Sequence, residues 1–144
     1  MKINESVEIQ EAISAGERVL DRIDEAIDYL DSARNWGLLD MFSKRSFLSS
    51  MIKHSKMDDA ERVMRKLEDD LYRFEKELRD VNVLSGIPDI STGDFFRFVD
   101  IFMDNTFVDI MALSRISDSK KQLNRLADEV EDILDELDRL SELY

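Results

Sequence analysis

The sequence predicts an all-α fold, an antiparallel bundle of three long helices with one or two short extra helices and coiled-coil-like packing. Only four Gly and one Pro occur in 144 residues, so few turns are expected to interrupt long helices. Three stretches also carry apolar or small residues in unbroken steps of three and four, which places each set on one helix face. These sets are Ile9, Ala12, Gly16, Val19, Ile23, Ala26, Leu30 and Ala33; Ala60, Met64, Leu67, Leu71, Phe74, Leu78 and Val81; and Leu123, Leu126, Val130, Ile133, Leu137, Leu140 and Tyr144.

We expect residues 1–144 to form a single helical-bundle domain, because a chain of this length buries roughly 70% of its extended surface without staples. The absence of Cys excludes disulfides, Cys-ligated zinc and a thiol nucleophile. No apolar run has the length of a signal peptide or a membrane span. These features predict a cytoplasmic protein.

The first long helix is predicted over residues 5–34, since Ser6 and the acidic residues after it suit a helix start. Gly37 can adopt the left-handed conformation that closes a helix, so Asn35-Trp36-Gly37 is expected to end it.

Apolar residues in segment 38–54 do not keep the phase of the second apolar set, which predicts a short separate helix over 43–54. Ser55 then caps a second long helix that reaches about Val81. Residues 84–93 contain the only Pro and two Gly, and are the strongest loop signal.

The closing region, residues 94–142, can form one helix of roughly 70 Å or two helices with a break near Asp104-Asn105-Thr106. We prefer the break, because an unbroken helix would outrun both of its partners. Residues 107–113 are apolar nearly all round, so a fully buried turn is expected there. If the 3-4 pattern is extrapolated back from Leu123, three polar residues fall on the apolar face: Asn105, Asp109 and Ser119.

The net charge of −13 makes this an acidic protein that repels phosphates and anionic lipid. We therefore expect no nucleic-acid partner and no stable membrane association. The closing acidic run, with eight carboxylates over residues 128–142, suits a solvated helix face or docking onto a basic partner.

Metal and cofactor sites have little support, and we expect neither. A di-iron bundle needs Glu-x-x-His on two helices, whereas the chain has one His, His54, with Met51 three residues before it. Two predicted helices carry acidic residues that a carboxylate-only Mg²⁺ site of the nucleotide-pyrophosphohydrolase kind would need. Their acidic residues lie beside the apolar faces, so we expect solvated carboxylates paired with Arg18, Arg22 or Arg34. The carboxylates are Asp21, Asp24, Asp28 and Asp31 on the first helix and Glu129, Asp132 and Glu136 on the last.

Residues 41–57 are chemically the most distinctive segment, with four Lys or Arg, one His and no acidic residue. The segment fits either a helix that covers the end of the bundle or a surface that binds an anion or a partner. A polar pocket that Asp109 shares with Arg115 or with a base of this segment is the other candidate site, because a buried carboxylate needs a partner. The candidate ligand- or partner-binding residues are Asp40, Lys44, Arg45, Lys53, His54, Asp109 and Arg115.

Scattered positions over residues 33–120 resemble a family of small bacterial all-helical proteins of uncharacterised function. This resemblance implies a helical bundle and carries over no catalytic residue. It rests on Trp36-Gly37, Asp40-Met41, Lys53-His54-Ser55, Asp59-Ala60, Phe74, Glu77-Leu78 and Asp80-Val81.

The leading functional hypothesis is a non-enzymatic helical-bundle module for protein–protein interaction or self-association, with the last helix as its coiled-coil-like interface. One alternative is an enzyme or small-ligand binder with a polar pocket near the 36–55 segment, resembling a metal-dependent nucleotide hydrolase. The other is an acidic protein that docks on a basic partner.

Overall fold

A computed structural model describes the backbone of residues 2–43, 46–85, 92–112 and 115–143, and the side chains of 6–32, 61–81, 93–110, 112 and 115–143. It contains α1 (Lys2–Ser43), α2 (Ser46–Ser85), α3 (Thr92–Met111) and α4 (Ile116–Ser141). Within these residues the chain is helical and has no strand, which confirms the all-α prediction. The architecture has four helices rather than three long helices with short additions.

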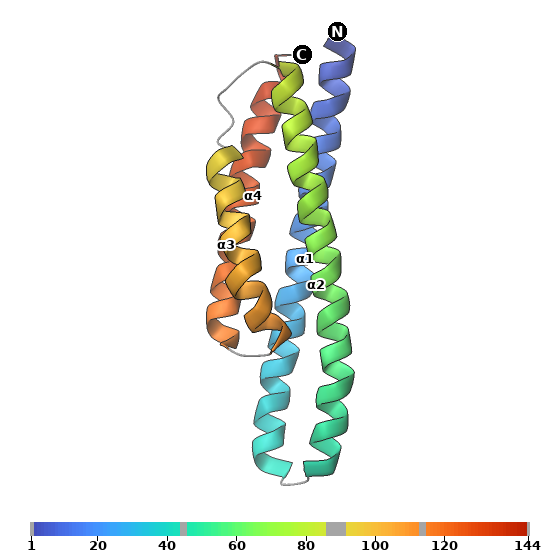
Figure 1. Ribbon diagram of the computed structural model, residues 1–144, viewed down its shortest axis with the longest axis vertical. Helices are drawn as coiled ribbons and strands as arrows, with labels where there is room; N and C mark the ends of the chain where they lie inside the picture. The colour runs from blue at the N-terminus through green and yellow to red at the C-terminus, as the bar shows by residue number, and fades with distance from the viewer. Residues whose placement is uncertain (1, 44–45, 86–91, 113–114, 144) are drawn as a thin grey trace.

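The four helices run alternately in opposite directions, and α1 and α2 form a hairpin that extends well beyond α3 and α4 (Figure 1). Helix α1 packs against α2 and α4, and α3 packs against α4 and α2. The first half of α1 and the second half of α2 therefore belong to a four-helix body, whereas the connected ends of the hairpin project from it (Figure 1).

The three apolar sets form the core of this body. Every member whose side chain the structure describes is buried, which confirms the predicted faces. Ala15 and Tyr29 widen the buried face of α1, because this helix contacts neighbours on two sides. Gly16 lies where α2 and α4 approach α1 closely, since a Cβ there would lie 2.6 Å from Leu134 Cδ2 and 2.9 Å from Phe74 Cε1.

The predicted helix boundaries between residues 34 and 55 are wrong. Helix α1 continues through Trp36 and Gly37 to Ser43, and α2 is one helix from Ser46 onward, with no separate short helix over 43–54. A Gly inside a helix costs only about 1 kcal/mol, so it does not by itself end one. The change of apolar phase is tolerated because α3 and α4 do not extend along this part of the hairpin (Figure 1).

The expected break in the closing region exists but lies later in the chain. Helix α3 ends at Met111, and Arg115 precedes α4 with a φ of 51° and a ψ of 50°. The buried face of α3 turns away from the extrapolated pattern, so Asn105 is exposed and Asp109 is only half-buried. Residues 107–113 are not a fully buried turn, since Val108 is 56% exposed. The buried residues of α3 are Phe95, Val99, Phe102, Thr106 and Ile110.

No helix within the described ranges combines the length and the apolar character that crossing a lipid bilayer demands.

Candidate functional site

Five of the seven candidate residues lie outside the residues whose side chains the structure describes: Asp40, Lys44, Arg45, Lys53 and His54. Whether they form a binding surface stays a prediction.

The other two candidates flank the connection between α3 and α4. Asp109 is half-buried on α3 and has an interaction partner, as a partly buried carboxylate requires. Arg115 is exposed and occupies the N-cap position of α4, with no side-chain hydrogen bond that caps the helix. Its backbone conformation reverses the chain direction, which gives it a structural role at this turn.

The acidic residues of α1 that were weighed as metal ligands are exposed: Asp21, Asp24, Asp28 and Asp31. The expectation that they are solvated is confirmed. Their expected arginine partners are partly wrong, because Asp31 pairs with Lys120 of α4. Arg22 instead bonds Asp70 of α2 at 2.9 Å and Glu25 at 2.8 Å. The Arg22–Asp70 and Asp31–Lys120 pairs connect neighbouring helices of the body, and the Arg22–Glu25 pair lies within α1.

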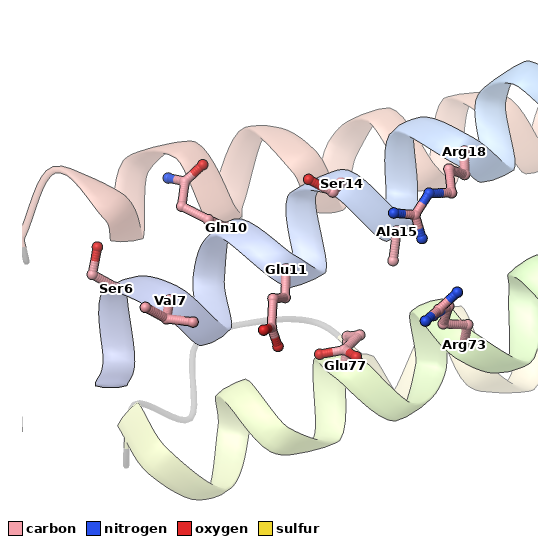
Figure 2. Close-up of a pocket in the computed structure, with 9 residues that line it drawn as sticks. All are labelled: Ser6, Val7, Gln10, Glu11, Ser14, Ala15, Arg18, Arg73 and Glu77. Carbon is pink, nitrogen blue, oxygen red and sulfur yellow. The ribbon is translucent and has the colours of Figure 1, made fainter. Parts of the chain in front are cut away.

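A groove with a volume of about 540 Å³ lies between α1 and α2 in the four-helix body (Figure 2). Ala15 lines its buried part, and the exposed side chain of Val7 lines its outer part. Three short polar side chains of α1 also face it: Ser6, Gln10 and Ser14. The space exists because α1 carries small side chains where it faces the long side chains of α2.

Charged residues give the groove an acidic part and a basic end. Glu11 of α1 and Glu77 of α2 lie near the middle of the groove, Arg18 of α1 and Arg73 of α2 border one end, and Ser6 and Val7 lie at the other end (Figure 2). Each charged pair therefore brings two like charges together from facing helices. Among the described residues, no hydrogen bond or ion pair neutralises Arg18 or Arg73.

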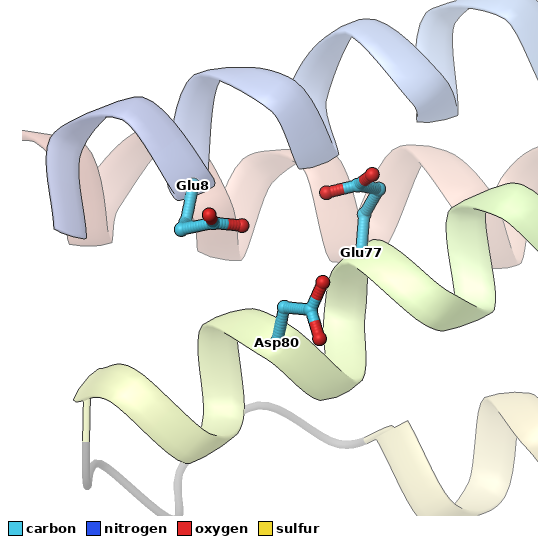
Figure 3. Close-up of side chains that lie close together, drawn as sticks. All are labelled: Glu8, Glu77 and Asp80. Carbon is cyan, nitrogen blue, oxygen red and sulfur yellow. The ribbon is translucent and has the colours of Figure 1, made fainter. Parts of the chain in front are cut away.

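Glu77, in the acidic part of the groove, also belongs to a cluster with Glu8 and Asp80. The nearest carboxylate oxygens of these three residues lie within 4.8 Å of one another (Figure 3). One oxygen each of Glu8 and Glu77 is buried without a hydrogen-bond partner. Burial raises the pKa of Glu77, and the neighbouring carboxylates of Glu11, Glu8 and Asp80 raise it further. Carboxylate oxygens in this arrangement are the ligand type that Mg²⁺ and Ca²⁺ prefer.

A second buried carboxylate, Glu75, lies on the side of α2 that faces α3. Its side chain is 8% exposed, and Oε2 lies 3.5 Å from Arg79, which also stacks over the ring of Phe96. Burial raises the pKa of Glu75; Arg79 opposes this shift and Asp100 reinforces it. The pair joins α2 to α3, and its place between packed helices indicates a structural role.

Sequence reasoning missed both the groove and the acidic cluster. Glu77 and Asp80 are three residues apart and share a helix face, which was a readable signal. Their contact with Glu8 and Glu11 depends on the register of the α1–α2 hairpin. This register could not be predicted, because the turn between the two helices was expected at the wrong residues.

No protein-family model, no curated protein and no solved structure matches this chain. The resemblance to small bacterial all-helical proteins therefore stays a prediction, and the functional argument rests on the geometry of the chain itself.

Proposed function

We propose that the chain is a non-enzymatic protein-interaction module and that the groove between α1 and α2 is its docking surface. The observation that carries this proposal is the presence of two like-charged pairs along the groove, where Glu11 faces Glu77 and Arg18 faces Arg73. Like charges that face each other oppose the packing of α1 on α2, and a partner of complementary charge relieves both repulsions.

The sequence-based choice of the last helix as the interface needs revision. The apolar face of α4 is buried inside the chain, and Val130 in its middle is 0% exposed. This face contacts α1 and α3 rather than solvent. A second chain reaches it only if the bundle opens, so the interaction surface is sought on the outside of the body.

The groove suits a protein side-chain surface better than a small substrate. Its borders are long charged side chains, of which Glu11, Arg18 and Arg73 are exposed. Small-molecule sites are mostly apolar and enclose their ligand.

The proposal is tested by placing a photo-crosslinking amino acid at Ser14 in the middle of the groove, in the cell that makes the protein. We expect a covalent adduct with a second polypeptide. The matched control carries the crosslinker at Asp104, which is exposed on α3, away from the groove. Absence of any adduct at Ser14, or equal adducts at both positions, contradicts a docking function for the groove.

A further inference from the structure

The charge pattern of the groove has a direction. Along α1, Glu11 and Arg18 are seven residues apart, which is about 10 Å or two helical turns. On α2, Arg73 lies across from Arg18, and Glu77, four residues further along, lies between the levels of Glu11 and Ala15 (Figure 2). The groove therefore has an acidic pair near its middle and a basic pair at one end.

Such a pattern is complementary to itself after a rotation of 180°. A two-fold axis that passes near Ser14, midway between the two charged pairs, places the acidic pair of one chain on the basic pair of the other. Symmetric dimers use the same patch on both chains, so each favourable contact occurs twice. A chain that does not carry both signs in this order matches only half of the groove.

We propose that the occupant of the groove is a second copy of this chain, bound in antiparallel orientation about that axis; this inference rests on the docking function proposed above. Glu11 and Glu77 of one chain then lie against Arg18 and Arg73 of the second copy, and the reverse contacts complete the interface. Glu11, Arg18 and Arg73 are exposed, so three of the four charged residues reach a second chain without a change of fold, whereas Glu77 is half-buried.

Side-chain size supports this arrangement. Ser14 is small and exposed, and helix axes approach more closely where side chains at the contact are short. Burial is the main cause of the raised pKa of Glu77, and the carboxylates of Glu11, Glu8 and Asp80 add a smaller repulsion, which guanidinium groups of a second chain oppose.

The test uses sedimentation equilibrium of the full chain, in EDTA, from about 5 to 200 µM. We expect wild-type dimers at the upper concentrations and at least tenfold weaker association in two charge-reversed variants, Arg18→Glu/Arg73→Glu and Glu11→Arg/Glu77→Arg. An equimolar mixture of the two variants has one fully acidic and one fully basic groove. Association at or above the wild-type level is expected only in this mixture.

Net charge alone predicts a different order. The chain carries −13, and each reversal changes this by two units, giving about −17 for the Arg→Glu variant and about −9 for the Glu→Arg variant. If overall repulsion controlled association, the Glu→Arg variant would dimerise best, whereas local pairing makes it weaker than wild type. Lys121→Glu/Arg97→Glu is the control for the acidic change, because it gives the same net charge at exposed positions outside the groove.

Three results overturn the inference: a wild-type chain that is monomeric at every concentration, dimers that persist in both charge-reversed variants, and a mixture that fails to associate. Dimers that form only when Mg²⁺ or Ca²⁺ replaces EDTA also overturn it, since they assign the contact to the carboxylate cluster. Circular dichroism checks that each variant is folded.

Failure here and failure of the docking function are distinguishable. A monomeric purified chain whose Ser14 crosslinks to a different polypeptide in the cell retains the docking function and loses the second copy as its occupant. A monomeric chain with no Ser14 adduct loses both.

Discussion

The charges that flank the α1–α2 contact are paired differently at two levels along the hairpin, although the same buried apolar contact runs through both levels. Where Arg22 lies beside Asp70, opposite charges join the two helices at 2.9 Å. One to three turns closer to the start of α1, like charges face each other across the groove, with Arg18 near Arg73 and Glu11 near Glu77 (Figure 2). The difference teaches that flanking charges are not the main force that holds this hairpin together.

The buried apolar faces hold it instead. They run continuously through both levels, and the residues that line the contact are 0–2% exposed from Ile9 to Leu30 on α1, except for Tyr29 at 7%. Exposed ion pairs contribute about 0.2–1 kcal/mol, whereas burying one large apolar side chain contributes about 1.5–3 kcal/mol. Flanking positions are therefore free to serve another chain.

The largest expected effect comes from cutting the apolar contact. Phe74→Ala is expected to lower the free energy of unfolding by about 3–5 kcal/mol, because Phe74 is 0% exposed and packs edge-on against Phe95 at 5.5 Å. Tyr72→Ala, which removes a 54% exposed ring of the same helix, is the control, with a change below about 1 kcal/mol. Urea denaturation measures both, and equal losses would contradict the dominance of the buried face.

The next effect tests the closeness of the helices beside the groove. Gly16→Ala is expected to destabilise the chain by about 1–2 kcal/mol, because the new Cβ collides with Leu134 and with the packed ring of Phe74. Gly93→Ala is the control, since no atom lies within 4 Å of a Cβ there, and Ala favours a helix by up to about 1 kcal/mol. Thermal melts that shift in the same direction for both variants would contradict the close approach.

A smaller effect compares the two charged levels directly. Arg22→Met is expected to cost about 1 kcal/mol, because it leaves the partly buried carboxylate of Asp70 without its guanidinium partner. Arg18→Met is expected to change the free energy of unfolding by less than about 0.5 kcal/mol, since it removes a repelling charge. A loss at Arg18 as large as that at Arg22 would mean that the like-charged level supports the monomer.

The smallest effect is a pH dependence set by the two carboxylates whose pKa is raised, Glu75 and Glu77. From their ordinary pKa of 4.5 up to their raised values, the folded chain binds more protons than the unfolded chain. The free energy of unfolding therefore falls as pH rises through this window, and it is higher near pH 5 than at pH 7.

Glu77→Gln is expected to reduce this dependence, because it removes one of the two groups. The control Glu17→Gln removes an exposed negative charge elsewhere on α1 and is expected to leave the slope nearly unchanged. Urea midpoints measured at pH 5 and pH 7 give the slope, and a rise of stability with pH in the wild type would contradict the assignment.

Periodicity predicted the all-α class and the buried faces of α1, α2 and α4, since a 3-4 repeat places residues on one side of a helix whatever its partner is. It failed at helix ends. Gly37 and Ser55 are helix-ending and helix-starting residues by local preference, but α1 and α2 run through both positions. It also failed on α3, where Asn105 turned out exposed, because a break at residues 112–115 separates the phase of α3 from that of α4.

The candidate site was less predictable than the fold. The charged residues of the groove are unremarkable in the sequence, where each lies among neighbours of both signs. They form a candidate site only because Glu11 lies near Glu77 and Arg18 lies near Arg73. These pairs form when α1 and α2, which are distant in the sequence at these positions, pack side by side.

The sequence by itself determined that this chain is a set of amphipathic helices with an acidic surface, because helical period and net charge are properties of local order and composition. Only the tertiary structure decided that the apolar face of α4 is buried inside the chain and that α1 and α2 bring like charges together. The register between helices sets both, and that register results from the packing of the whole core rather than from any one segment.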